Sequence, residues 1–317
     1  MDPQPDRAPA PPPGPGRKSV LAFFGVLLVL WVPGAFAQSV VLPLGLAWTE
    51  LFVFLLSALV ATSGSNLRAV PYLRLGPARP AALALGGLAG AAGYLFAGSL
   101  LALTQRLVPS RLVEAFDPVR LFEGPRPERL ALAAVATLLA PPCEEIAFRG
   151  YVQTTLGLRS GPAAAIAGSA VLFALLHVNP VLFPALVVLG ALFGWLTWRA
   201  GSIWPAVLAH AVNNAITSAS VLADLGPLPE PPPLSAVAGG LGLGTAAVLV
   251  IAVAYHAATR EPPPLAGAVV LRDPGDPSIR FAPGRVVPRL AAAAFVGATL
   301  LAALLAKGLP GGRPRGP

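Results

Sequence analysis

The chain has 317 residues, of which 55% are hydrophobic and only 11% are charged. Soluble domains carry about 25% charged residues, so this composition excludes a soluble globular protein and indicates a multi-pass membrane protein. The net charge of +8 does not point to nucleic acid, because no basic run with interleaved aromatic residues is present. A single cysteine excludes an intrachain disulfide.

The N-terminal segment, residues 1–18, is rich in proline and predicts a disordered cytoplasmic tail. The apolar run 19–37 follows it and ends in a small-residue pattern typical of signal-peptide cleavage after Ala37. An uncleaved first transmembrane helix explains the same run, because further spans come after it. Both alternatives stay open at this point.

The fold class expected is all-α, a polytopic bundle of about eight or nine transmembrane helices. The apolar runs expected to span are 19–37, 44–63, 80–103, 129–156, 161–178, 180–198, 203–223, 236–258 and 289–306. The chain divides into the tail 1–18, the N-terminal spans with an interfacial helix 19–126, a core 127–223, and the C-terminal spans, polar segment and tail 224–317.

Two proline-containing places interrupt the helical pattern. The mixed-charge stretch 105–128 has apolar residues at helical spacing and predicts an amphipathic interfacial helix, broken at Pro118. Pro141-Pro142 interrupts the fourth run, because proline removes a backbone donor and clashes with the preceding turn. The segment after it is expected to begin a helix of its own, with proline in the first turn.

The arginines and lysines favour an N-terminus in the cytoplasm, since cytoplasmic loops carry an excess of these residues. The tail 1–18 and the linker 64–79 hold three each, whereas the loops 38–42 and 224–235 hold none. The stretch 105–128 then lies outside against the rule. With this orientation, the protein is expected in the inner, cytoplasmic membrane of the cell.

Glu144, Glu145 and Arg149 lie at the end of the fourth apolar run. Ionisable groups at membrane depth are costly and mark functional sites by default. Glu145 and Arg149 are four residues apart and predict a structural ion pair. Adjacent residues on a helix point about 100° apart, so the two glutamates are not expected to face one centre. Glu144 is left as the carboxylate that can activate a water.

Two of the three histidines lie in later apolar runs. His177 follows Phe173 by four residues, and His210 precedes Asn214 by four, so each pair shares a helical face. Histidine supplies a base, a metal ligand or a donor, and asparagine supplies a neutral donor for an oxyanion. Together with a glutamate, these side chains suffice for water-mediated peptide hydrolysis.

Other interpretations of single residues are possible. One buried histidine or asparagine more often joins helices by hydrogen bonds than performs chemistry. Cys143, next to the glutamates, suits a nucleophile paired with histidine, but a small buried side chain is the simpler interpretation. The metalloprotease motif H-E-x-x-H does not occur in the sequence.

The pattern Glu144-Glu145-x-x-x-Arg149, Phe173-x-x-x-His177 and His210-x-x-x-Asn214 resembles the three motifs of the CPBP (CAAX protease and bacteriocin-processing) intramembrane proteases. That family includes the type II CAAX prenyl endopeptidases and the lysostaphin-resistance-like bacterial proteins. The resemblance implies that Glu144 and His177 activate the water and that His210 and Asn214 bind the oxyanion. It leaves two mechanisms open, a metal-free glutamate mechanism and a zinc enzyme in which His177, His210 and Glu144 are the ligands.

The sequence therefore predicts an intramembrane endopeptidase, a multi-pass membrane hydrolase that resembles CAAX prenyl proteases and is a metalloendopeptidase if zinc is its cofactor. Its expected partners are the lipid bilayer and a membrane-protein or lipidated-peptide substrate, and no nucleic acid. A proton-coupled transporter remains an alternative, because intramembrane glutamate and histidine also form proton relays. A non-catalytic protein that binds membrane peptides, for instance in immunity, is a third.

Overall fold

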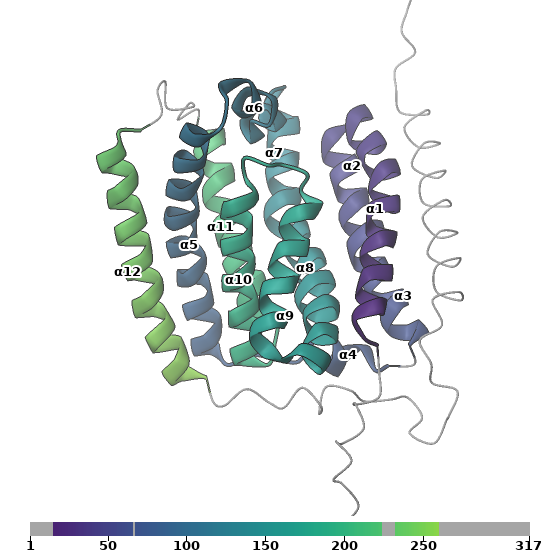
Figure 1. Ribbon diagram of the computed structural model, residues 1–317. Helices are drawn as coiled ribbons and strands as arrows, with labels where there is room; N and C mark the ends of the chain where they lie inside the picture. The colour runs from purple at the N-terminus through teal and green to yellow at the C-terminus, as the bar shows by residue number, and fades with distance from the viewer. Residues whose placement is uncertain (1–14, 66, 224–231, 260–317) are drawn as a thin grey trace, which may run out of the picture.

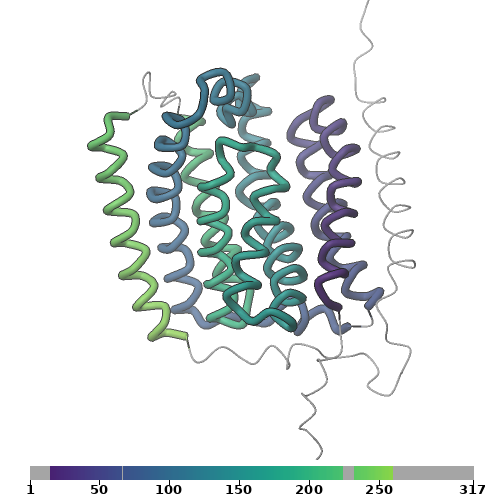
Figure 2. Tube along the Cα trace, in the orientation of Figure 1, coloured from purple at the N-terminus to yellow at the C-terminus, as the bar shows by residue number. Residues whose placement is uncertain are grey.

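The computed structural model describes residues 15–65, 67–223 and 232–259. Within these ranges the chain is helical and contains no strand. Figure 1 shows the long helices standing side by side, with α12 and α5 at one edge and α1, α2 and α3 at the other. The tube in Figure 2 follows the same path along the chain. The predicted all-α membrane bundle is confirmed.

The helical elements follow one another with short connections. In chain order they are α1 Arg17–Val40, α2 Leu42–Trp48, η1 Thr49–Leu55, α3 Leu56–Gly64, α4 Ala69–Tyr72, α5 Pro80–Leu107, α6 Ser110–Ala115, η2 Pro118–Phe122, α7 Arg126–Ala134, η3 Val135–Leu139, α8 Ala140–Glu145, η4 Ile146–Gln153, α9 Thr154–Leu176, α10 Phe183–Ala200, α11 Trp204–Leu222 and α12 Leu234–Ala258. Four of them depart from α geometry: η1, η3 and η4 are π-helical and η2 is a 3₁₀ helix. The three π-helical elements lie inside continuous helical runs. η3 and η4 flank α8, which carries Glu144 and Glu145, and η1 packs against α8.

Six helices in the described part of the chain are long and apolar enough to cross a membrane. They are Arg17–Val40, Leu42–Gly64, Pro80–Leu107, Arg126–Leu176, Phe183–Ala200 and Leu234–Ala258. The 51-residue run Arg126–Leu176 is two limbs, because the chain turns at Gly161, which has a φ of 74°. The Ser169 hydroxyl donates to the Phe148 carbonyl at 2.9 Å, so the second limb folds back on the first.

With that run divided and α11 added, the described helices correspond to the first eight predicted spans. α11 lies at the predicted run 203–223 and is a 19-residue helix. The ninth predicted span, 289–306, lies outside the described residues. The tail 1–18 is described only from residue 15 onward, where α1 begins at Arg17.

The helix does not break at Pro141-Pro142, contrary to the sequence prediction. α8 does begin there with proline in its first turn, as expected, but η3 joins it directly to α7. In this π turn the Ala140 N–H bonds to the Val135 carbonyl, five residues back. In a π turn, each N–H bonds to the carbonyl five residues back instead of four. The helix therefore continues through the prolines without unwinding, although single carbonyls lose their backbone partners.

The stretch 105–128 is broken at its proline, as predicted. α6 ends at Ala115, and the 3₁₀ helix η2 begins at Pro118. The Asp117 carboxylate accepts a hydrogen bond from the Val119 N–H at 2.9 Å and caps this helix. The result is two short helices, which Figure 1 shows across one end of the bundle, in place of a single amphipathic helix.

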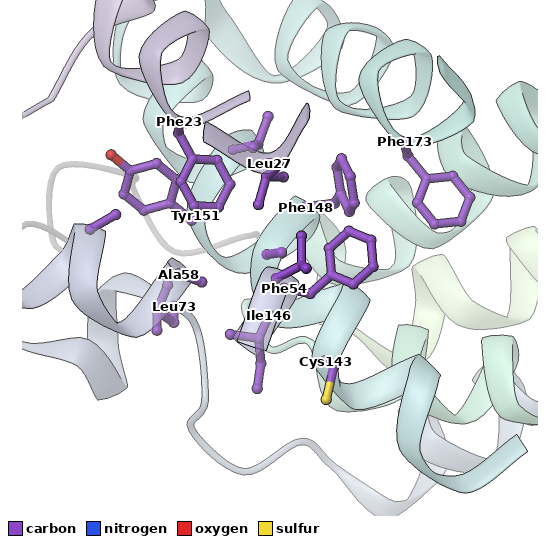
Figure 3. Packing of buried hydrophobic residues seen from close by; sticks show 14 of the residues in the cluster. Phe23, Leu27, Phe54, Ala58, Leu73, Cys143, Ile146, Phe148, Tyr151 and Phe173 are labelled. Carbon is purple, nitrogen blue, oxygen red and sulfur yellow. The ribbon is translucent and has the colours of Figure 1, made fainter. Parts of the chain in front are cut away.

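The N-terminal spans pack against the motif helix through aromatic side chains. Phe23 of α1 lies 4.5 Å from Tyr151 of η4 between ring centroids, and Phe54 of η1 lies 6.0 Å from Phe148 of η4. Figure 3 shows these rings meeting in one cluster. Lipid is as apolar as these side chains, so close packing rather than water exclusion holds such helices together. The cluster fixes α1–α3 against the segment that carries Glu144 and Glu145.

Backbone contact between α5 and α11 sets the position of His210. Gly90 of α5 lies so close to α11 that a Cβ there would overlap the carbonyl oxygen of Ala209. Glycine permits this approach because it has no side chain. Since Ala209 precedes His210, the contact holds the histidine at a fixed height in the bundle.

Several arginines bind the carbonyls at the C-terminal ends of helices. Arg79 donates to the Ala258 carbonyl at 3.1 Å, and Arg199 donates to the carbonyls of His256 and Thr259, both at 3.1 Å. The last carbonyls of a helix lack intrahelical partners and carry partial negative charge, so a cation stabilises them. This capping accounts for part of the basic charge without a nucleic-acid partner.

Candidate active site

The two glutamates of the motif end α8 and lie deep in the bundle. Glu144 is 7% exposed, and Glu145 is fully buried. The Arg149 guanidinium, also fully buried, donates from Nη1 to Glu145 Oε1 at 3.1 Å and from Nη2 to the Gly190 carbonyl at 3.0 Å. The four-residue spacing therefore produces a buried ion pair, and Arg149 links η4 to α10.

His210 lies between the two glutamates. Its Nδ1 is 3.0 Å from Glu145 Oε1, and its Nε2 is 3.8 Å from Glu144 Oε2. The expectation that the adjacent glutamates would not face one centre is wrong. The two nitrogens lie on different edges of the imidazole, and the flexible glutamate side chains reach one edge each. Glu145 thus belongs to the site and is more than a partner of Arg149.

The contact with Glu145 determines the orientation of the imidazole. A carboxylate accepts a hydrogen bond, so Nδ1 carries the proton and donates it to Glu145. In the neutral ring, Nε2 is then an acceptor, and it points toward Glu144. The gap of 3.8 Å is too long for a direct hydrogen bond. Both atoms are close enough to contact one water between them.

Aromatic rings enclose this group of charges. The Phe193 ring stacks on His210 with centroids 5.1 Å apart, and Phe173 meets His210 edge-on at 5.9 Å. The Arg149 guanidinium lies 4.5 Å above the centroid of Phe173. Such stacking holds the imidazole and the guanidinium at fixed angles and keeps their surroundings apolar. Phe173, predicted as a supporting residue, contacts both. Phe193 was missed, because nothing in the sequence distinguishes it from other phenylalanines in apolar runs.

His177 is at the end of α9, on the other side of Phe173. The two rings are 4.7 Å apart, and His177 Nδ1 donates to the Phe173 carbonyl at 2.9 Å. The side chain is exposed and forms no ion pair with a described residue. The Glu144–His177 pair that the resemblance implies is therefore not within contact distance in this arrangement, where His210 is the histidine next to Glu144.

Asn214 is on α11, one turn after His210, and donates from Nδ2 to the Ala136 carbonyl of η3 at 2.9 Å. That carbonyl is one of those that the prolines leave without a backbone partner: Ala140 bonds to Val135, and Pro141 has no N–H. Asn214 therefore joins α11 to the motif helix here. Its predicted role toward an oxyanion stays a prediction.

The described residues do not assemble the predicted zinc site. A catalytic zinc takes three protein ligands. Glu144 and His210 offer two neighbouring atoms, and no group of three or more His, Cys, Asp or Glu side chains in the described chain is placed to hold one metal ion. Cys143 is buried and does not complete such a group. These donors do not fit a catalytic zinc as they are arranged.

Residues 126–216 match a family model, that of the type II CAAX prenyl endopeptidase Rce1-like proteins. The matched segment runs from α7 to α11 and contains Glu144, Glu145 and Arg149, with the two histidine motifs. This segment is therefore similar to an Rce1-like domain. Neither the curated proteins nor the solved structures contain a significant match to the chain. The Rce1-like domain begins after α5, so α1–α5 and α12 lie outside it.

One buried acid near the motif helix lies outside the Rce1-like domain. Glu50 is on η1, which packs against α8, and is 1% exposed. It lies in the second predicted span, 44–63. The available signal was a glutamate inside an apolar run, but a single sequence does not show which later residue such an acid will face.

Proposed function

We propose that this protein is an intramembrane endopeptidase that hydrolyses peptide bonds with a water held between Glu144 and His210. The observation that carries the proposal is the 3.8 Å separation of Glu144 Oε2 from His210 Nε2, with Nδ1 of the same ring held by Glu145. Both facing atoms are acceptors. One water can donate its two protons to them, which leaves its lone pairs free for a carbonyl carbon.

In the proposed reaction, the water oxygen attacks the carbonyl carbon of the scissile bond while Glu144 takes one of the water protons. The carbonyl oxygen becomes an oxyanion. When the C–N bond breaks, the proton on Glu144 passes to the leaving nitrogen, so that an amine and a carboxylic acid, which keeps the second water proton, are released. The acid then ionises and gives that proton to solvent. The Glu145–Arg149 pair keeps the His210 proton on Nδ1 throughout and so maintains the acceptor at Nε2.

His177 and Asn214 are proposed to act on the substrate. His177 is exposed and its Nε2 is not used by the bond to Phe173, so that atom is available to a peptide entering at the end of α9. The Asn214 amide has a second N–H besides the one bonded to Ala136, and this is a donor for the oxyanion. A role of His177 with Glu144 in holding the water, as the resemblance implies, would require the end of α9 to move.

The proposed substrates are membrane-embedded or membrane-anchored peptides. The site lies among helices long enough to cross a membrane, and the Rce1-like family is described by its action on CAAX prenyl proteins. A lipidated peptide and a membrane-spanning peptide are both consistent with this location. The bilayer itself is the expected surroundings, in the cytoplasmic membrane with the N-terminus inside.

Cleavage assays with purified protein in lipid vesicles test the proposal. The substrates are a prenylated CAAX peptide, its unprenylated form and a set of membrane-spanning peptides, with Glu144→Gln as the matched inactive control. We expect products from the wild type that Glu144→Gln does not form. Cleavage that is equal in both proteins would overturn the mechanism. Absence of cleavage for every substrate, with movement of protons or solutes across the vesicle, would favour the transporter alternative.

A further inference from the structure

The turn between α9 and α10, residues 177–182, contains a strained residue. Val178 has a φ of 49°, in the left-handed region, although its side chain is β-branched. This conformation costs free energy and persists only where the surrounding structure holds it. The Val178 side chain is 51% exposed, so hydrogen bonds of the turn rather than side-chain packing must hold it. His177, at the end of α9, directly precedes this residue.

The Asn179 side chain supplies such hydrogen bonds in two directions. Its Oδ1 accepts from the N–H groups of Val181 at 3.1 Å and Leu182 at 3.0 Å, just before α10 begins. Its Nδ2 donates to the Phe116 carbonyl at 2.9 Å, 63 residues earlier in the chain. Phe116 lies between α6 and η2. One side-chain amide therefore shapes the start of α10 with its oxygen and binds the α6–η2 segment, residues 110–122, with its nitrogen.

The α6–η2 segment has little packing of its own. Neither α6 nor η2 contains a buried residue. Figure 1 shows both helices across one end of the bundle. Segments with few buried apolar contacts open at low free-energy cost, so single hydrogen bonds have a large influence on where they lie. The bond from Asn179 to Phe116 joins this segment to the turn that follows His177.

The end of α9 is itself wound by short-range bonds. The His177 N–H bonds to the Ala174 carbonyl at 3.3 Å, and the Val178 N–H bonds to the Leu175 carbonyl at 3.1 Å, each three residues back. The His177 ring bonds to the carbonyl of Phe173 in the same turn. Helix ends of this kind fray readily. The place of the imidazole therefore depends on the turn that follows it.

We propose that Asn179 is a positioning residue for His177, which it fixes by joining the α9–α10 turn to the α6–η2 segment. The proposal rests on the proposed peptidase function, in which His177 meets the incoming peptide. With the bond to Phe116 in place, Val178 stays left-handed and the last turn of α9 stays wound. Without that bond, Val178 relaxes to a negative φ, the last turn of α9 frays, and His177 no longer presents Nε2 in one direction. The α6–η2 segment and His177 thus act as one unit.

Hydrogen–deuterium exchange of the protein in lipid, resolved to single amides, measures this link without substrate. Asn179→Asp keeps an oxygen acceptor for the two N–H groups before α10 but has no N–H for the Phe116 carbonyl. It should leave amides 181–182 protected. Amides of residues 112–122 and 174–178 should exchange about 3- to 10-fold faster, as expected for the loss of one hydrogen bond. Asn179→Ala removes donor and acceptor, so it should speed exchange in all three places.

Thr104→Ala is the matched control, because it removes a partly buried hydroxyl bonded to the backbone near the end of α5. It should change none of these rates. Unchanged exchange of residues 112–122 in both Asn179 variants would overturn the proposal, and so would faster exchange there with an unchanged end of α9. If Asn179→Ala does not fold, Asn179→Asp decides the question alone, because an aspartate before a helix is a favourable residue.

Turnover shows whether Asn179 acts through His177. Asn179→Asp should raise KM by about 3- to 10-fold with little change in kcat, because His177 contacts the substrate and not the water. In a His177→Gln background the same substitution should cause no further loss, because there is no imidazole left to position. Losses that multiply in the double variant would indicate a role independent of His177 and overturn the proposal. A wild type that cleaves nothing but shows the expected exchange pattern would refute the peptidase and support the link between α6–η2 and His177.

Discussion

Glu145 and His210 are joined by a hydrogen bond of 3.0 Å between Oε1 and Nδ1, although they are 65 residues apart in the chain. The same Oε1 accepts from Arg149 at 3.1 Å. One carboxylate oxygen thus fixes a guanidinium within its own helix and an imidazole on another. The site is therefore built around Glu145, and Glu144 is the acid left free to act on a water.

Breaking the buried ion pair should destabilise the protein more than changing the proposed base. Arg149→Ala leaves Glu145 charged and buried, and such a change costs about 3–5 kcal/mol. We expect a lower melting temperature and folded yield. Glu144→Gln should leave both close to wild type, because Glu144 has no partner at Oε2 to lose. The exposed Glu128→Gln is the control. Unfolding of Glu144→Gln with an unaffected Arg149→Ala would reverse these roles.

Glu145→Gln should lower turnover as well as stability. A glutamine can present its N–H₂ to His210 Nδ1, which favours the other tautomer and turns Nε2 into a donor. The acceptor facing Glu144 is then lost. Nitrogen-15 NMR of labelled histidine reports the tautomer directly, with His177→Gln in the background to simplify assignment. An unchanged Nδ1-protonated His210 in Glu145→Gln would contradict the proposed orientation.

Asn214→Ala should have two separable effects. The Ala136 carbonyl loses its partner, which costs about 1–3 kcal/mol of stability for a buried group. Removal of an oxyanion donor lowers turnover by about 10²–10³-fold. Thr217→Ala, which removes a hydroxyl bonded to the Asn213 carbonyl of the same helix, is the control. A stability loss with full turnover would leave Asn214 as a link between helices only.

Removal of metal should leave proteolysis intact. A catalytic zinc takes three protein ligands, and no three His, Cys, Asp or Glu side chains of the described residues are arranged to hold one metal ion. We expect activity in the presence of a chelator and no stoichiometric zinc in the purified protein. Stoichiometric zinc that is lost in His177→Ala, together with activity, would establish the zinc enzyme and require His177 to move toward His210.

Labelling of introduced cysteines tests the orientation of the chain. The native Cys143 is 2% exposed and should not react. Pro77→Cys and Glu123→Cys place thiols at exposed positions near α4 and α6, which Figure 1 shows at opposite ends of the bundle. In intact cells, an impermeant maleimide should label Glu123→Cys and reach Pro77→Cys only after permeabilisation. The reverse pattern would place the N-terminus outside.

The sequence predicted the spans well, because a helix that crosses the membrane forms its backbone hydrogen bonds within itself and is recognised by its long apolar composition. The Glu145–Arg149 pair could also be predicted from the sequence, since its two residues are only four positions apart. The position of His210 between two glutamates could not be predicted, because it depends on how α11 packs on α5 at Gly90. The π turn before Pro141-Pro142 was also missed, because it relies on a donor, Asn214, supplied 78 residues away. The periodicity of one span does not show which residues of another span it will contact.

The local character of the Glu145–Arg149 pair has a consequence for synthesis of the protein. α7–η4 leaves the ribosome and enters the membrane before α11, so the acids must be accommodated while His210 does not yet exist. A charged residue at the centre of an inserting helix costs about 2.5–3.5 kcal/mol. Because Arg149 is one turn from Glu145, this helix brings its own counter-charge into the bilayer. Its insertion can therefore precede assembly of the site, and α11 need only dock on a helix that is already neutralised.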